Sequence, residues 1–163
     1  MSIFMSYEGV EGEASDAHGH AGWLDIKDVY WGVNRRVTSH TSTRNDRESA
    51  NAEIRDLIVT RHMDSATPRL VIESCCGRGK DVVIHLTKTG TGSGADVFME
   101  WTLKNALISK YEVEGRGQSN RRPLEKLTIS FVDIEMKYTP YDENGSPMAP
   151  SVVGFDTSTN ERR

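Results

Sequence analysis

The feature that most constrains the fold is the alternation of apolar and polar side chains between residues 124 and 139. Its apolar members are Leu127, Ile129 and Phe131, followed by Val132, Ile134, Met136 and Tyr138. Successive side chains of a strand leave opposite faces, so a period of two predicts a half-buried strand. The phase slips by one residue between Phe131 and Val132, and such a slip would turn the buried face over. We expect a bulge or sharp bend there, which lets one long strand serve two surfaces of a mainly β protein.

The same alternation recurs in several shorter segments. They span residues 3–7, 23–33, 54–63, 82–88, 97–103 and 151–157. It resumes at Leu107 and runs to Val113, so the strand that begins at 97 either continues long or breaks near Asn105. The segment 23–33 carries apolar groups on both faces, which predicts cover from the core on one side and from another layer or subunit on the other. The set predicts a mainly β protein in which the long strand over 124–139 curls across a barrel.

Residues 67–76 carry the strong helix signal of the chain. Thr67 is a good N-cap, and Pro68 stands at the first helical position, where its missing N–H costs nothing. Gly77 suits the left-handed conformation that closes many helices. Leu70 and the residues at helical spacing after it form a short apolar stripe, so we expect one short helix to lie against the barrel.

The two cysteines, Cys75 and Cys76, are adjacent in the sequence. Neighbouring side chains diverge, so a disulfide between them would need a strained small ring, and the spacing of a metal site is absent. We expect both thiols to be reduced and mostly buried, which suits synthesis in the cytoplasm.

Residues 34–51 form a long connection with one real hydrophobe, Val37, and no period that could be buried. Structureless connections of this length are uncommon in compact domains and are usually functional or disordered. The Ser and Thr content also allows an extended hairpin arm. A partner-binding arm and a plain disordered loop remain as alternatives.

Charge is unevenly spread along the chain. Residues 1–28 hold six acids and one base, whereas residues 34–47 hold four arginines and one acid. These patches are either two solvated faces or a means of steering copies of one chain together head to tail. The formal net charge of −4 argues against a nucleic-acid partner, which would need a basic surface.

Length and hydropathy predict an ordinary soluble protein. With 163 residues, 36% of them hydrophobic, the chain has room for one core, so we expect a single domain over residues 1–163. No apolar run approaches the ~20 residues that a membrane helix needs, so no membrane insertion is expected. The start of the sequence lacks a basic region and a sustained apolar segment, which predicts no cleavable signal peptide.

Residue patterns that would carry chemistry are weak. The glycine clusters at 77–81 and 90–94 lead into strands, not into the helix that a phosphate-binding loop requires. Neither a nucleophile elbow nor a cysteine nucleophile signature is present. His18 and His20 are the best metal candidates, but spacing marks no third ligand, and His85 is isolated and points away from Ile84 and Leu86. We therefore predict no enzyme activity and no cofactor.

Several motifs nonetheless occur together in a defined order. They are Gly9-Val-Glu-Gly-Glu13, His20-x-x-x-x-Asp25 leading to Trp31-Gly32, Asp64-Ser-Ala-Thr-Pro68-x-Leu70, Leu127-Thr-Ile-Ser-Phe131 with Tyr138-Thr-Pro140, and Gly154-Phe-Asp156. In this order and spacing the chain resembles the haemolysin-coregulated protein (Hcp) family, the tube subunit of bacterial type VI secretion systems. The Ser-, Thr- and Arg-rich loop departs from the glycine-rich composition of some members.

The resemblance implies a barrel-like fold of two sheets with one helix and no catalysis. It implies a hexameric ring with a wide channel, and rings that stack into a tube. A contracting sheath expels that tube with a spike at its tip and sometimes with small effectors inside the ring. The protein would then be cytoplasmic when assembled and secreted to the exterior or a target cell.

The basic loop is our candidate for the contact between rings, where it would meet acids of the next ring. The residues in question are Arg35, Arg36, Thr41, Arg44 and Arg47. The main alternative is a small monomeric β-barrel binding module that uses residues 34–51 as its arm. A metal-dependent enzyme built on His18 and His20 is the third.

Overall fold

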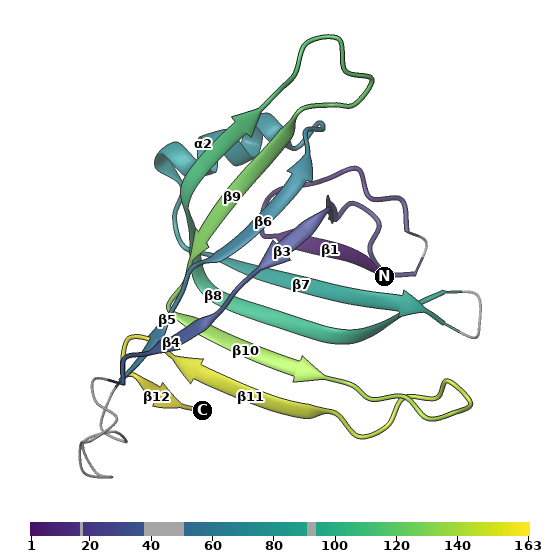
Figure 1. The fold of residues 1–163 in the computed structure, drawn as a ribbon, viewed down its shortest axis with the longest axis vertical. Coiled ribbons are helices and arrows are strands. Elements are labelled where there is room, and N and C mark those ends of the chain that lie inside the picture. Colours follow the sequence, from purple (N-terminus) through teal and green to yellow (C-terminus); the bar gives the residue numbers. More distant parts are fainter. Residues whose placement is uncertain (17, 38–50, 91–93) are drawn as a thin grey trace.

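The computed structural model describes residues 1–16, 18–37, 51–90 and 94–163, and over these residues it is mainly β with one helix, α2 (Thr67–Cys76) (Figure 1). The strands are β1 (Ser2–Tyr7), β2 (Leu24–Ile26), β3 (Asp28–Tyr30), β4 (Val33–Arg35), β5 (Ala52–Ile54), β6 (Leu57–His62), β7 (Lys80–Thr89), β8 (Ala95–Glu114), β9 (Leu124–Ser130), β10 (Asp133–Tyr138), β11 (Ser151–Asp156) and β12 (Glu161–Arg162). The mainly β class and the helix were predicted, and the short strand β12 was not.

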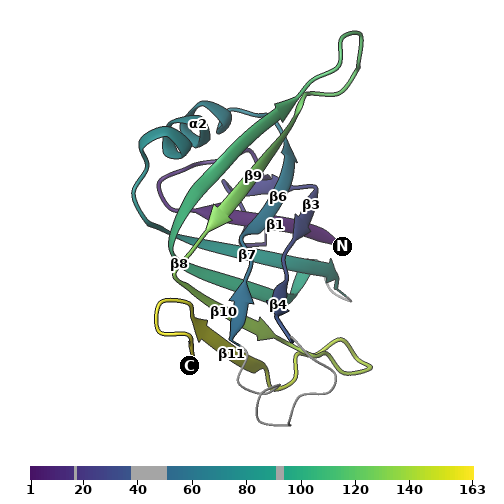
Figure 2. The ribbon, with the colours of Figure 1, turned by 60° about the vertical axis from the view of Figure 1, so that its left-hand side comes forward.

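Ten strands form one antiparallel sheet, and β4 and β5 form a second, small one. The large sheet runs in the order β12-β11-β10-β8-β7-β1-β2, and β8 also carries the branch β9-β6-β3. This branch crosses the layer that contains β1 and β7 (Figures 1 and 2). Among the described strands β2 pairs with β1 alone, so the ladder does not close. The prediction of a barrel of two packed sheets is therefore corrected to one folded sheet and a small one.

The fold turns on β8, which belongs to both layers. Its first half pairs with β7 and β10, and its second half pairs with β9. Between these halves Asn105 has a φ of +51°, in the left-handed region that side chains rarely adopt. Of the two sequence alternatives, the long strand is correct, and Asn105 marks the point where it changes layers.

The bend predicted between Phe131 and Val132 is confirmed. The chain leaves β9 there and resumes as β10 on the other layer, so the predicted long strand is two strands. The first apolar phase, which ends at Phe131, is buried as expected. In the second strand Ile134 is buried together with Asp133, whose carboxylate accepts a 2.6 Å hydrogen bond from Arg163.

The single strand expected over 23–33 is wrong. The chain breaks at Lys27 and again at Trp31–Gly32, which gives β2, β3 and the start of β4. These three strands pair with β1, β6 and β5, respectively. Apolar groups on both faces arose because the segment passes from one layer to the other, and not because one strand is covered on both sides.

The position of α2 is confirmed, but its two ends differ from the prediction. The N-cap is Ala66, with no side-chain cap bond, and the Thr67 hydroxyl instead accepts from the Asp64 amide at 3.1 Å. Gly77 has a φ of −66°, which is extended and not left-handed. A Cβ at Gly77 would lie 2.4 Å from the carbonyl oxygen of Glu73, so the close backbone approach is what requires glycine.

The buried stripe of α2 consists of Thr67, Leu70 and Glu73. Cys75 and Cys76 are unbonded to each other and exposed, so their predicted burial is wrong. The stripe ends before the last turn of the helix, where both cysteines are exposed. No helix within the described ranges is long and apolar enough to cross a membrane.

Candidate assembly surface

Rows of side chains cross the large sheet from its core to its outer strand. In one row Ile84 of β7 pairs with Trp101 of β8, Trp101 with Met136 of β10, and Met136 with Val153 of β11. Residues directly opposite in antiparallel strands share a face, so all four lie on the side of the core. Ile84 is fully buried, Trp101 and Met136 are half-buried, and Val153 is 45% exposed. The apolar face therefore extends beyond the part that the chain itself covers.

We call the uncovered part of this face the apolar shelf. It comprises Met99, Trp101, Met136, Tyr138 and Val153, all on β8, β10 and β11. The Trp101 ring lies 6.4 Å from the ring of Trp31, the nearest aromatic cover from the other layer. Its buried Nε1–H has no hydrogen-bond acceptor among the described residues. A buried indole N–H usually has a partner, but this one is enclosed by the chain itself, so what the shelf offers a second polypeptide is apolar area.

The edge of the sheet beside the shelf is open. β12 pairs with β11 at Phe155 and Asp156, and Arg163 adds a bond to the Gly154 carbonyl. Over the part of the chain that the structure describes, residues 151–153 have no strand on their outer side. An unpaired edge presents backbone donors and acceptors that another strand can use. Shelf and edge together form a surface suited to a second polypeptide.

The predicted stacking residues divide between described and undescribed parts of the chain. Arg35 ends β4 and Arg36 follows it, and both are exposed. Thr41, Arg44 and Arg47 lie outside the described residues, so their role stays a prediction. Because β4 pairs with β5 in register, the segment 34–51 starts and ends as a hairpin. This hairpin lies at the opposite end of the molecule from the 115–123 loop (Figures 1 and 2).

The base of the hairpin is held by aromatic and cationic contacts. The Arg55 guanidinium lies 5.7 Å from the Tyr30 ring centroid and donates to the Tyr30 hydroxyl at 3.2 Å. The indole of Trp31 donates to the Arg55 carbonyl at 3.0 Å. These bonds connect β3 with the start of β6, so the direction of the hairpin is fixed at its root.

The histidines do not form the metal pair considered from the sequence. His20 is buried, and its two ring nitrogens lie within hydrogen-bond distance of Asp16 and His85. His18 is exposed and contacts Asp16 at 3.2 Å. Within the described ranges no group of three or more His, Cys, Asp or Glu side chains is placed to hold a metal ion. His85 does point away from the core as predicted, but it is not isolated.

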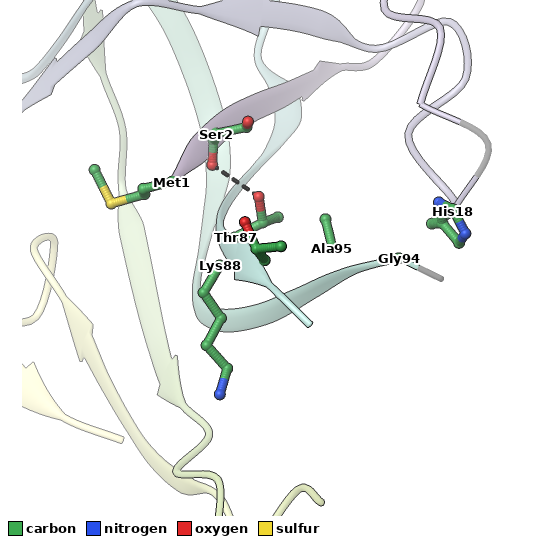
Figure 3. Close-up of a pocket in the computed structure, with 8 residues that line it drawn as sticks. Met1, Ser2, His18, Thr87, Lys88, Gly94 and Ala95 are labelled. Atoms are coloured by element: carbon green, nitrogen blue, oxygen red, sulfur yellow. Dashed lines mark hydrogen bonds between the residues drawn. The ribbon is translucent and has the colours of Figure 1, made fainter. Parts of the chain in front are cut away.

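The cavities are shallow and chemically mixed. One of about 340 Å³ lies between the N-terminus and the β7–β8 hairpin, where His18 faces Gly94 (Figure 3). A larger one of about 520 Å³ combines Arg61 and Arg122 with acids. There a hydrogen bond from Arg122 lowers the pKa of Glu13, and burial raises the pKa of Asp25. Neither cavity gathers groups of one kind for a ligand.

A buried ionic network that sequence reasoning missed joins α2 to the sheet. Arg61 of β6 pairs with Glu125 of β9 and, at 2.5 Å, with Asp64. The hydroxyls of Thr67 and Tyr111 donate to Glu125 at 3.2 and 2.7 Å. Burial, reinforced by Glu125, raises the pKa of Tyr111. The Glu125 carboxylate is fully paired, whereas Arg61 Nε has no hydrogen-bond partner among the described residues.

This arrangement of strands is shared with known proteins. A profile of the family described as type VI secretion system effector, Hcp, matches residues 4–138. The chain is 26% identical over 149 residues to Protein hcp1 of Pseudomonas aeruginosa, over 90% of this chain and 88% of that protein. It matches a solved type six secretion system protein with a TM-score of 0.88 at 22% identity, with 99% of each chain covered. Hcp1 from Salmonella typhimurium matches with a TM-score of 0.74 at 16% identity, over 99% of this chain and 98% of that one. The two structural likenesses concern the fold alone.

Proposed function

Since the chain belongs to the Hcp family of type VI secretion proteins, we propose that it is the structural subunit of the secretion tube and forms hexameric rings that stack. The observation that carries the proposal is the apolar shelf, which continues the core face of the sheet to the open edge of β11. A lone chain leaves Tyr138 and Val153 about half exposed there. A second copy would cover them.

We infer a ring and not a two-fold dimer for the proposed subunit contact. In this contact the shelf of one copy meets a different surface of its neighbour, which makes the contact heterologous. Heterologous contacts that close by rotation produce rings, and repetition of rings along the axis produces a tube. Each copy would thereby cover the open edge of the next, which removes a site of uncontrolled strand pairing.

The hairpin is assigned to the contact between rings. Arg35 and Arg36 are exposed at its base, and the predicted contacts Thr41, Arg44 and Arg47 continue it. Opposite charges across such an interface set register and orientation. The proposed partners within the tube are other copies of the chain, in the same ring and in the next. The family resemblance adds the spike, the sheath and small effectors in the channel. The protein is proposed to be cytoplasmic when assembled, secreted with the tube, and without catalytic activity of its own.

Imaging of the purified protein in negative stain tests the ring. Annular particles of uniform diameter are expected at micromolar concentration. Lone globules at every concentration and ionic strength would contradict the ring and would favour the monomeric binding module.

Charge reversal tests the stacking contact separately. Arg35→Glu/Arg36→Glu should leave single rings intact and remove stacks, as measured by sedimentation at low and high salt. Lys110→Glu/Lys126→Glu, which makes the same change of charge at exposed positions on β8 and β9, is the matched control and should stack normally. Unchanged stacking of the arginine variant at low salt would reject the assignment.

A further inference from the structure

Four titratable side chains form a continuous line on the outer face of the sheet. Asp16 Oδ2 lies 2.5 Å from His20 Nδ1, His20 Nε2 lies 2.8 Å from His85 Nδ1, and His85 Nε2 lies 2.8 Å from Glu100 Oε2. Asp16 and His20 belong to the loop between β1 and β2, whereas the other two belong to β7 and β8. We call these four residues the histidine chain.

Aromatic rings enclose the two imidazoles. Phe4 stacks on His20 with a centroid distance of 4.4 Å, and Trp23 meets His20 edge-on at 4.9 Å and His85 at 4.7 Å. Phe4, His85 and Glu100 are direct cross-strand partners in β1, β7 and β8. The strand register therefore builds the site, and the loop closes it from outside.

Few other charged groups face the histidine chain. On the loop, His18 contacts the second oxygen of Asp16 at 3.2 Å. On β10, Lys137 pairs in register with Glu100 and disfavours a charge on His85. On β2, Asp25 is close enough to Asp16 for mutual repulsion. None of these groups replaces a contact within the chain.

The number of protons that the three contacts require can be counted. Each contact needs one hydrogen between its two heavy atoms, so three protons are required. Two neutral imidazoles supply two, and two ionised carboxylates supply none. With four protons, both histidines would carry two N–H groups, and the His20–His85 contact would bring two donors face to face. The observed geometry is satisfied by three protons and by no other number.

The third proton has a definite place. Burial lowers the pKa of His85, which keeps its ring neutral, with Nε2–H donating to Glu100. The hydrogen bond from His20 lowers the pKa of Asp16, which keeps that carboxyl ionised. With His85 donating through Nε2 and Asp16 accepting, all three contacts are made only when His20 donates at both nitrogens, to Asp16 and to His85.

We propose that the histidine chain is a proton-binding site that takes up one proton beyond two neutral histidines and so fastens the 11–23 loop to the sheet. When this proton leaves, one of the three contacts must open. The loop is held internally by four backbone hydrogen bonds of 2.7 to 3.0 Å among residues 12–16 and 18–23. At its tip the ring of His18 lies against Gly94, where a Cβ would come within 2.6 Å (Figure 3). Of the three contacts, His20–His85 joins the loop to the sheet, so its opening would also release the packing of His18 against Gly94.

Two isosteric variants keep all three contacts of the histidine chain but remove the need for the additional proton. In Glu100→Gln the amide donates to His85 Nε2, so His85 Nδ1–H donates to His20, and His20 Nδ1–H donates to Asp16. All three contacts then exist with two neutral histidines. Asp16→Asn supplies the missing hydrogen at the other end with the same result. Both variants should keep the loop closed but bind no extra proton.

Nitrogen-15 NMR of the imidazole rings in the full-length protein reads the proton directly. At pH 7 the unaltered protein should show one histidine protonated at both nitrogens and one neutral histidine bonded to it. Glu100→Gln and Asp16→Asn should show two neutral rings with the loop amides still protected from exchange. His62→Gln, whose ring bonds to the Arg122 carbonyl, is the control and should leave the pattern unchanged. Two neutral rings in the unaltered protein at pH 7 would overturn the proposal.

Unfolding as a function of pH provides a second readout that holds whatever the assembly state. Histidines of the unfolded chain lose their protons near pH 6.5, so above that pH the folded state binds one proton more. Stability must then fall as pH rises, and the folding constant of the unaltered protein should drop about tenfold per pH unit relative to Glu100→Gln. Below pH 6.5 the unfolded chain protonates His85 as well, so stability falls on that side too. Parallel pH profiles of the two proteins would contradict the site.

Discussion

The two halves of β8 share the same alternation of apolar and polar residues but differ in how far the chain buries their apolar face. In its second half β8 pairs with β9, which pairs with β6, and the core side chains Leu57, Leu127 and Ile129 of these two strands are fully buried. In its first half, residues 95–102 are half-buried, and β10 and β11 continue outward without cover from the chain. Alternation alone therefore does not tell a core from an interface. What differs is whether the second layer comes from the same polypeptide, so one region should govern folding and the other assembly.

The largest effect on folding is expected in the covered region. Arg61→Met would leave the buried Glu125 carboxylate without its cation. An uncompensated buried charge costs about 3–5 kcal/mol, which should appear as a loss of unfolding free energy in urea at pH 7. Arg116→Met, in which an arginine with an 84% exposed side chain leaves Glu114, is the control and should cost less than about 1 kcal/mol. Equal losses of unfolding free energy in the two variants would contradict the special role of the buried ion pair in folding.

The largest effect on assembly is expected in the uncovered region. Val153→Glu places a charge on the apolar shelf and should weaken subunit association by about 2 kcal/mol or more per contact, roughly thirtyfold. Unfolding free energy of the separated chain should change by less than about 0.5 kcal/mol, because Val153 is half exposed. Val113→Glu, at a strand valine of similar exposure (49%) in the covered half, should assemble normally. Sedimentation equilibrium of both variants measures the difference.

The joint between the regions should be sensitive to backbone conformation. Asn105 has a φ of +51°, so Asn105→Val should cost about 1–2 kcal/mol of unfolding free energy. Asn105→Gly relieves the same constraint and should cost a few tenths of a kcal/mol, a difference measurable by chemical denaturation. If valine and glycine were equally tolerated, β8 would not need a left-handed residue to change layers.

The smallest effect at neutral pH concerns Tyr7 in the covered region. Burial, aided by Glu73, raises the pKa of Tyr7 to about 12, and its hydroxyl has no hydrogen-bond partner within the described residues. An unfolded tyrosine ionises near pH 10, so the folded state binds more protons between about pH 10 and 12 and loses stability as pH rises. Tyr7→Phe should change stability by about 1 kcal/mol or less at pH 7 and flatten this alkaline decline. Tyr30→Phe, at an exposed ring, should leave the decline unchanged in the same urea titrations.

The sequence predicted correctly those elements that are determined by residues close together in the chain. The bend at Phe131–Val132 and the helix at 67–76 follow from phase and from helix-start residues. The breaks within 23–33 do not, because they are set by three different partner strands far along the chain. The burial of Cys75 and Cys76 was wrongly predicted, because helical spacing indicates an apolar stripe but not where its cover ends, which here is at Glu73.

The missed functional groups differ in how visible they were. Arg61 follows Leu57 and Val59 in the apolar phase of β6, and Glu125 precedes Leu127 and Ile129 in that of β9. A charge in a buried phase was a usable signal for an internal ion pair. The histidine chain had no such signal, because its members meet only when β1, β7 and β8 take their register. The strands that form the shelf were predicted from the sequence. The exposure of their apolar face could not be predicted, because it depends on which other strands of the chain pack over it.

The mass of the purified protein in solution, measured by light scattering over a range of concentrations, tests the central claim most directly. We expect a particle of six times the 18.2 kDa chain at micromolar concentration, which dissociates in Val153→Glu. A mass of a single chain at all concentrations and salt conditions, with the apolar shelf left open to water, would contradict it.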